Sequence, residues 1–286
     1  MHKPHLISKL IKATPTLLVG SALLFYSFSA KHPSAIAQPL TIIEEAPTEA
    51  SSFDSSNGLT TDLSELTGTY FRRPRNSRSR SRSRTTTATR QGSCLSESDT
   101  TFAILGPDVE VGQTSATHPS FVWYLPEAEE PYPLTFRLLE PNEKGIPTAI
   151  HTAELDYSAG FMKYQLPDSL SALSPGKEYR WQVVITCNPN YPSQDLLQEL
   201  SFEVVRPAAE LSQALSSAAT EADTALAYGQ SGLWYEAIAQ VALPATSASL
   251  SVRTGLLQNL SELEVDNENN PRFSEDIASI AEATAR

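Results

Sequence analysis

The sequence predicts a mainly β sandwich of about seven strands, followed by a small α-helical hairpin or bundle and preceded by a disordered N-terminal region. Three observations predict this order. Between residues 101 and 206, apolar and polar residues alternate with period two, and Pro and Gly clusters interrupt the alternation. After Arg206 the period becomes helical. Before Gly92 no apolar period is sustained.

The N-terminus has the three parts of a secretory signal peptide over residues 1–37. Basic residues precede an apolar run at residues 16–28, and small residues then lead up to Ala37. This run is shorter than the roughly 18 residues that a membrane-spanning helix needs. We therefore expect cleavage after Ala37 and export to the periplasm or the cell surface, with a retained membrane anchor as the alternative.

Residues 38–92 are predicted to form a disordered linker rich in Ser, Thr, Pro and Arg, because they bury too little apolar surface to offset chain entropy. The last part of this linker is a basic tether that contains no acidic residue. The tether arginines are Arg72, Arg73, Arg75, Arg78, Arg80, Arg82, Arg84 and Arg90. From residue 91 onward, 27 acidic residues outnumber 9 lysines and arginines. So acidic a body repels polyanions, which disfavours nucleic acid as a partner.

The predicted sandwich domain covers residues 93–206. Its candidate strands are residues 101–105, 121–125, 134–140, 148–155, 161–166, 178–186 and 199–205. The strongest local pattern is LSPGKEYRW, which contains Leu173 and in which Pro175 and Gly176 favour a turn. Tyr179 then opens a strand and shares its inward side with Trp181, which we expect in the core.

Cys94 and Cys187 are the two cysteines of the chain. In an oxidising compartment they are predicted to form one disulfide, and two buried free thiols are the alternative. In sandwich order, the start of the first strand and the end of the sixth lie at the same end of the domain. The predicted topology therefore brings the two cysteines together.

Residues 207–264 are predicted to be helical. Pro207 suits the first position of a helix whose apolar stripe ends near Gly229. Two more helices are expected in LWYEAIAQVAL, which Pro244 stops, and in SLSVRTGLLQNLSELE. The segment around Trp234 is similar to the turn of a tetratricopeptide-type hairpin, and one such hairpin must pack on the sandwich or on a partner. Residues 265–286 are predicted to form an acidic loop and a frayed, weakly amphipathic helix.

The sequence contains no G-x-S-x-G, H-E-x-x-H or phosphate-binding G-x-x-x-x-G-K motif. Two histidines remain after the signal peptide, His118 and His151. Glu154 would lie on the opposite strand face from His151, so the two do not make a metal pair. We expect no enzymatic activity, no cofactor and no metal.

Two loops at the end of the predicted disulfide are candidate binding loops. Residues 126–133 contain Glu127, Glu129, Glu130 and Tyr132, and residues 188–194 contain Tyr191. Ordinary Pro-rich turns are the alternative interpretation. We also hypothesise that the basic tether contacts this acidic loop, in the same chain or in a second copy.

The order of these parts resembles an exported cyanobacterial family known as domain of unknown function 928. The most specific matching pieces are HPSFVWYLP and GLWYEAI, and the matching pieces span residues 91–243. The resemblance implies cyanobacterial origin and export but no activity, and no functional residue can be transferred from it. Separately, LSPGKEYRW resembles the tyrosine corner of immunoglobulin-like and fibronectin type III domains, which implies a sandwich fold.

These observations favour an exported, non-enzymatic interaction or adaptor protein of the cell envelope. It would bind protein partners, envelope proteins or a second copy, through the sandwich loops and the helical hairpin, with the basic tether adding electrostatic attachment. Two alternatives stay open. One is a carbohydrate-binding or carbohydrate-active envelope protein, and the other is polyanion binding by the arginines, for example to an anionic cell-wall polymer.

Overall fold

The computed structural model describes residues 70–74, 76, 78, 93–95, 101–268 and 270–285, all within the unit formed by residues 61–286. The predicted signal peptide, including its cleavage site after Ala37, lies outside the described residues. Outside them too are five of the tether arginines, namely Arg75, Arg80, Arg82, Arg84 and Arg90. The predictions made for these residues stay predictions.

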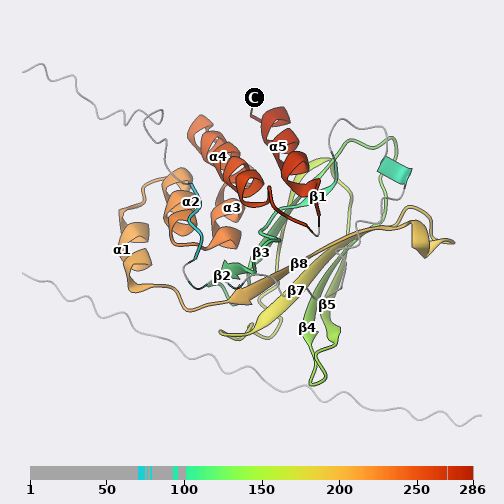
Figure 1. Ribbon diagram of the computed structural model, residues 1–286, viewed down its shortest axis with the longest axis horizontal. Helices are drawn as coiled ribbons and strands as arrows, with labels where there is room; N and C mark the ends of the chain where they lie inside the picture. Colours follow the sequence, from blue (N-terminus) through green and yellow to red (C-terminus); the bar gives the residue numbers. More distant parts are fainter. Residues whose placement is uncertain are drawn as a thin grey trace, which may run out of the picture. The chain divides into compact units, whose positions relative to one another are not determined.

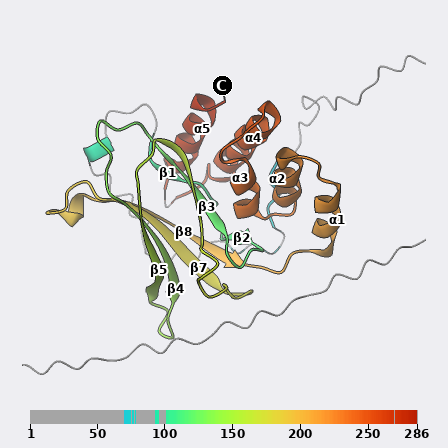
Figure 2. The ribbon, with the colours of Figure 1, turned by 180° about the vertical axis from the view of Figure 1, so that it is seen from behind.

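Within the described residues, eight strands form two sheets (Figures 1 and 2). The strands are β1 (Ala103–Ile104), β2 (Gly112–Thr114), β3 (Ser120–Leu125), β4 (Leu134–Pro141), β5 (Pro147–Leu155), β6 (Gly160–Gln165), β7 (Glu178–Ile185) and β8 (Leu196–Val204). The smaller sheet has the order β1-β3-β6 and the larger β2-β8-β7-β4-β5. All neighbouring strands are antiparallel except β2 and β8. Each of the seven predicted strands overlaps an observed one, and β2 is the additional strand.

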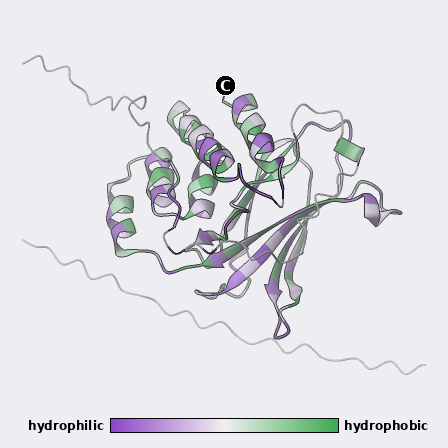
Figure 3. Ribbon diagram, viewed as in Figure 1, coloured by the Kyte–Doolittle hydropathy of each residue, from purple (hydrophilic) through white to green (hydrophobic). Residues whose placement is uncertain are grey.

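The core between the sheets is aromatic. Phe121 and Trp123 on β3 lie against Phe136 on β4 and Trp181 on β7, and all four side chains are fully buried. Ring centroids are 5.2 Å apart for Phe121 and Phe136, and 6.5 Å apart for Trp123 and Trp181. The period-two pattern predicts this arrangement, since alternate side chains of a strand point to the same face. Hydrophobic and hydrophilic residues interleave along the strands in Figure 3.

Five helices follow the strands. They are α1 (Ala209–Ser217), α2 (Glu221–Gln230), α3 (Trp234–Val241), α4 (Ser247–Leu263) and α5 (Phe273–Ala283). The prediction of a β-rich domain followed by helices is therefore confirmed. Short 3₁₀ segments lie at Ser93–Leu95 and Pro192–Gln194.

The helix predicted from Pro207 to Gly229 is wrong in two respects. Pro207 precedes α1 instead of opening it, since Ala208 is the N-cap residue. The predicted helix is also interrupted between α1 and α2, where Thr220 forms a capping box with Asp223. The Thr220 side chain accepts the Asp223 N–H at 3.1 Å, and the Asp223 carboxylate accepts the Thr220 N–H at 3.0 Å. These reciprocal bonds satisfy N–H groups that a helix start leaves unpaired, so a new helix begins there.

The C-terminal helix α5 is packed, not frayed as the sequence predicts. Phe273, Ile277, Ile280 and Ala281 are buried on one side of it. Ser261 of α4 donates to the Ser274 carbonyl oxygen at 2.9 Å, and Ser274 donates back to the Ser261 carbonyl oxygen at 2.8 Å. In Figure 1, α4 and α5 lie side by side over the β1 end of the sandwich. The predicted domain boundary at residue 265 therefore separates two helices that pack together.

Three consecutive residues at the start of α3 fasten the helices to the sandwich. Trp234 donates its indole N–H to the Leu105 carbonyl oxygen at 2.9 Å. The Tyr235 hydroxyl accepts the Trp181 indole N–H at 3.1 Å. Glu236 accepts the Ser115 and Ala116 backbone N–H groups at 2.6 and 3.0 Å. Of the two predicted docking places for the hairpin, the structure therefore shows the sandwich.

Within the described part of the chain, no helix is long and apolar enough to cross a membrane.

Candidate functional site

The disulfide predicted between Cys94 and Cys187 is present, with the two Cα atoms 5.7 Å apart and a sequence separation of 93 positions. It joins the segment before β1 to the end of β7. The Tyr132 hydroxyl donates to the Cys94 carbonyl oxygen at 3.0 Å, and the Thr186 N–H donates to the Pro133 carbonyl oxygen at 2.9 Å. One candidate binding loop and the disulfide therefore support each other.

The candidate binding loops present acidic and aromatic side chains at this end. Glu127, Glu129 and Glu130 are exposed, and Tyr191 exposes 60% of its surface. Tyr132 is half-buried, with its ring in edge contact with Tyr157 at a centroid distance of 6.3 Å. We call these five residues, without Tyr157, the acidic-aromatic rim. The disulfide and the bonds of Tyr132 hold the two loops close together.

Tyr157 holds the acidic loop of the rim in place, although the sequence analysis did not identify it. Its hydroxyl donates to the Pro126 carbonyl oxygen at 2.7 Å. Burial, and then the nearby Glu127 carboxylate, raise the pKa of Tyr157 to about 12. The hydroxyl therefore keeps its proton at neutral pH and fixes the start of the acidic loop.

Hydrogen bonds hold the predicted turn at Pro175 and Gly176 against Tyr179 and the neighbouring strand. The Tyr179 hydroxyl accepts the Ser174 N–H at 3.0 Å. Leu173 is buried, and its N–H donates to the Thr117 carbonyl oxygen at 3.0 Å. In the turn after Pro175, the Gly176 N–H donates to the Val204 carbonyl oxygen at 2.7 Å. These contacts lie at the start of β7, whereas the disulfide lies at its end. The pattern therefore stabilises the fold and does not belong to the candidate binding loops.

Residues 70–74, which we call the strap, correct the prediction that the whole of residues 38–92 is disordered. Asn259 on α4 accepts the Tyr70 and Phe71 N–H groups at 2.8 and 3.0 Å. The Arg72 N–H donates to the Gly229 carbonyl oxygen at the end of α2 at 3.0 Å. Phe71 is buried, and its ring meets that of Trp234 edge-on at a centroid distance of 5.2 Å. The strap is therefore part of the folded domain.

The first tether arginines do not contact the acidic loop. Arg73 forms an ion pair with Glu110, with 3.3 Å between Arg73 Nε and Glu110 Oε2. The Arg78 carbonyl oxygen accepts the Val111 N–H at 3.0 Å. Within the chain, Arg73 therefore pairs with Glu110 and not with Glu127 to Glu130. A contact with the acidic loop of a second copy stays a prediction, as does any contact by the arginines outside the described residues.

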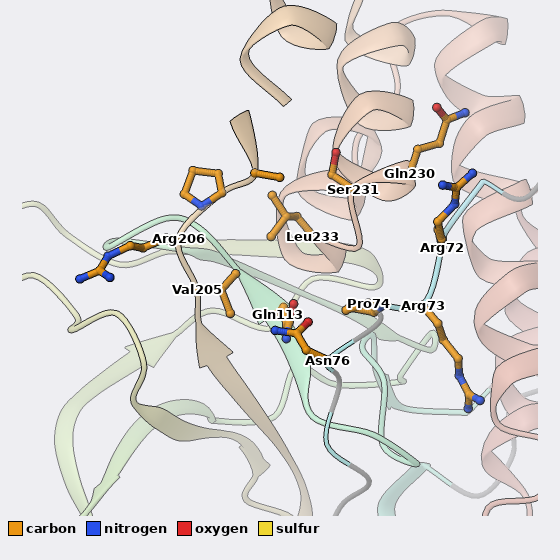
Figure 4. A pocket seen from close by; sticks show the side chains of 12 residues that line it. Arg72, Arg73, Pro74, Asn76, Gln113, Val205, Arg206, Gln230, Ser231 and Leu233 are labelled. Atoms are coloured by element: carbon orange, nitrogen blue, oxygen red, sulfur yellow. The ribbon is translucent and has the colours of Figure 1, made fainter. Parts of the chain in front are cut away.

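A pocket of about 360 Å³ lies between the strap, β2 and the start of α1. Its lining includes Arg72, Arg73 and Arg206 together with Gln113 and Leu233. Figure 4 shows the Arg73 and Arg206 side chains pointing in different directions, away from the centre of the pocket. Since the guanidinium groups do not converge, the pocket lacks the geometry of an anion site.

A buried acidic network lies beside the strap, and sequence reasoning missed it as well. Glu264, which has no exposed surface, accepts the Asp108 N–H at 2.8 Å and the Asn267 side-chain N–H at 2.7 Å. Asn267 also donates to Asp108 Oδ2 at 2.9 Å. Burial is the largest influence on Glu264 and raises its pKa from 4.5 to about 7, although the bonds from Val109 and Asn267 oppose the rise.

The histidines take part in structural hydrogen bonds. His118 Nε2 lies 3.0 Å from the Leu170 carbonyl oxygen. His151 Nε2 lies 2.7 Å from the Tyr164 hydroxyl, which links the edge of the larger sheet to β6. Among the described residues, no three or more His, Cys, Asp or Glu side chains gather in a way that could hold a metal ion.

Comparison with known proteins gives one match. No curated protein and no solved structure matches the chain. The family model described as Domain of Unknown Function (DUF928) matches residues 85–278, which is more than half of the chain and includes both cysteines, all eight strands and the fastening residues of α3. The strap lies before the matched region. The chain therefore belongs to the DUF928 family.

Proposed function

We propose that this protein is an exported, non-enzymatic adaptor of the cell envelope, and that it binds a basic segment of a protein partner through the acidic-aromatic rim. The observation that carries the proposal is the exposure of Tyr191 and of three glutamates on two loops, one bonded to Cys94 through Tyr132 and the other directly following Cys187 of the disulfide. Exposed tyrosines and rigid loops favour contact with a partner, since little conformational freedom is lost on binding.

The contacts of α3 favour the rim over the helical hairpin as the surface for such a partner. In a sandwich with a helical hairpin, both the loops and the helices are possible binding surfaces. Trp234 and Tyr235 have no exposed surface, and their polar atoms bond to the sandwich. The side of α3 that carries them is therefore occupied within the chain, and the rim is the better candidate.

We also propose that the β domain is immunoglobulin-like. Supporting this, the first, second and fifth of the predicted strands form one sheet (β1, β3, β6), and the other four form the second (β5, β4, β7, β8). This is the partition of a Greek-key sandwich. The bond from Ser174 to the Tyr179 hydroxyl supports a tyrosine corner. The added β2 strand pairs parallel to β8 and extends the second sheet.

Export is the remaining part of the proposal. The Cys94–Cys187 disulfide supports it, since such bonds persist in oxidising compartments. The features of a signal peptide at residues 1–37 support it independently. Mass spectrometry of the protein from its native cells tests it, and a chain that begins at Gln38 and contains the disulfide is expected.

Cross-linked co-purification from the native envelope tests the rim. We compare the full chain with a variant that combines Glu127→Gln, Glu129→Gln, Glu130→Gln and Tyr191→Ala. The adaptor proposal expects one or a few partner proteins with the full chain, and at least a tenfold lower recovery with the variant. Raising the ionic strength should also lower recovery, because exposed charge pairs are screened by salt.

The matched control combines Glu143→Gln, Glu210→Gln and Glu282→Gln, which removes the same charge from exposed positions on other elements. It should recover the partners normally. Equal loss with both variants would show that total charge matters and not the rim. Recovery of an anionic polymer that is lost when residues 79–90 are deleted would instead support the polyanion alternative. That deletion leaves the strap in place.

A further inference from the structure

The strap binds its groove in the way that a peptide binds a receptor. Its backbone supplies the hydrogen bonds, from Tyr70 and Phe71 to Asn259 and from Arg72 to Gly229. Its side chains supply the anchors, since Phe71 exposes only 5% of its surface and lies against Trp234. Arg73 adds an ion pair with Glu110, which is itself buried. Backbone bonds with one deep aromatic anchor are the usual features of peptide recognition.

The groove is shaped for close approach of this segment. A Cβ atom at Gly255 on α4 would lie 2.5 to 2.7 Å from ring atoms of Tyr70, and a Cβ atom at Gly229 on α2 would collide with the Tyr70 carbonyl oxygen. Gly232, whose φ is 79°, lies against Pro74. Side chains at these positions would fill the space that Tyr70 and Pro74 occupy. The fit therefore depends on glycine, and at Gly229 and Gly255 it does so within helices, where glycine costs stability.

The strap is far from its contacts in sequence. The Tyr70 and Phe71 N–H groups bond to a residue 189 and 188 positions away. It contacts α2, α3 and α4 and, through Arg73, also Glu110 in the segment between β1 and β2. In Figure 1 the strap runs beside α2, where it joins the helices to the β2 edge. All of these contacts therefore join the strap to residues that are distant in sequence.

We propose that the groove between α2, α3 and α4 is a peptide-binding site for an extended segment with two adjacent aromatic residues and a basic residue two positions after them, and that its occupant is this chain's own Tyr-Phe-Arg-Arg-Pro segment. The site is separate from the acidic-aromatic rim and does not depend on the proposed function. Since the occupant is held by side-chain anchors and hydrogen bonds, the groove should bind the same segment as a separate peptide when the chain's own segment can no longer dock.

The test uses the full chain with Tyr70→Ala and Phe71→Ala combined. Removing the anchors should lower the Tm by about 10 °C, as expected for truncation of a buried aromatic residue in a chain of this size. Trypsin should then cut between Arg72 and Arg73 faster than in the unaltered chain, because the Arg72 backbone is no longer held. A synthetic peptide with the sequence of residues 67–78 is then added. It should bind the variant saturably, one peptide per chain, and restore most of the lost Tm.

Arg72→Ala is the matched control in the chain, because the Arg72 side chain is exposed and its backbone bond is kept. Its Tm should change by less than about 1 °C. The same peptide with alanine at the Phe71 position is the control ligand and should not restore the Tm. If the double variant does not fold, Tyr70→Ala alone and Phe71→Ala alone replace it, because each weakens the strap and leaves Asn259 and the rest of the groove unaltered. Each single variant should lower the Tm by less than the double variant and should take up the peptide.

Three results would overturn the proposal. The first is an unchanged Tm and unchanged trypsin cleavage in the double variant. The second is a lowered Tm with no saturable peptide binding, which would make the strap an inseparable part of the fold. The third is a Tm that rises with protein concentration in the unaltered chain together with dimers, which would place the strap of a second copy in the groove.

Discussion

At the scale of single residues, the Tyr235 hydroxyl is a joint between the helices and the sandwich. The residue has no exposed surface, and its ring also contacts Phe121 and Phe202 at centroid distances of 5.6 and 5.5 Å. Tyr235→Phe would keep these ring contacts but leave the buried Trp181 indole N–H without its partner. We expect the free energy of unfolding, measured with urea, to fall by about 1 to 3 kcal/mol. Tyr191→Phe, at an exposed position, is the control, and a Tyr235→Phe variant as stable as the unaltered chain would contradict this role.

Glu264 makes stability depend on pH. Burial raises its folded-state pKa from 4.5 to about 7, so between these values the folded chain binds a proton that the unfolded chain has lost. This contribution is fully present below pH 4.5 and disappears as the pH rises through about 7. Over that range Glu264 should lower the free energy of unfolding by up to about 3 kcal/mol, at 1.36 kcal/mol per pKa unit.

Glu264→Gln tests this, because glutamine does not titrate. Both proteins share all other carboxyl groups, including Asp108 and Glu110 beside Glu264, so the measured quantity is the difference in free energy of unfolding between variant and unaltered chain. This difference should shift in favour of the variant between pH 5 and pH 8. Glu143→Gln, at an exposed position, should show a constant difference. A constant difference for Glu264→Gln would mean that its pKa is not raised.

At the scale of elements, the strands were predictable and some other elements were not. Alternation of buried and exposed residues locates the strands, because each strand has one side in the core. β2 has no such pattern, since all of its residues Gly112–Thr114 are buried. It forms only by pairing with β8, about 90 residues away in sequence. The break before α2 had a local signal, the Thr-x-x-Asp capping box at Thr220, but the alanines around it continue the helical stripe.

In the candidate site, too, some features could be predicted from the sequence and others could not. The disulfide and the loop residues could be predicted, because strand order fixes which loops share an end of a sandwich. The strap could not, since its partner Asn259 lies 188 positions from Phe71 and no local period indicates so distant a contact. An aromatic pair in a segment otherwise rich in Ser and Arg was the one available signal. Disordered, solvated segments contain few aromatic residues, so an adjacent aromatic pair in such a segment indicates that it packs on a folded domain.

The glycine in α4 gives a prediction at this scale. Gly255→Ala should favour the helix by about 1 kcal/mol through propensity alone. In the unaltered chain, however, the new methyl group would displace the Tyr70 ring, and overpacking costs about 1 to 3 kcal/mol. We therefore expect a net loss of stability in the unaltered chain and a gain in the Tyr70→Ala background. Urea unfolding of the four proteins measures this change of sign, and the same effect in both backgrounds would show that Tyr70 does not occupy the groove.

At the scale of the whole molecule, the folded domain is fastened at two separate places. The strap holds the helices beside the β2 edge, and the disulfide ties the segment before β1 to the end of β7. The Arg78 carbonyl oxygen accepts the Val111 N–H, so the chain is held at Arg78 as well.

The disulfide closes a loop of 93 residues, for which the chain-entropy model gives about 4 to 5 kcal/mol of stabilisation. Cys94→Ser combined with Cys187→Ser should lower the free energy of unfolding toward that amount, and a reducing agent should lower the unaltered chain equally while leaving the variant unchanged. Because the strap and the disulfide share no contacts, the loss should add to that of Tyr70→Ala with Phe71→Ala to within about 0.5 kcal/mol. A combined loss much smaller than the sum would mean that the two fastenings stabilise the same cooperative step, so that freeing either one already releases the other.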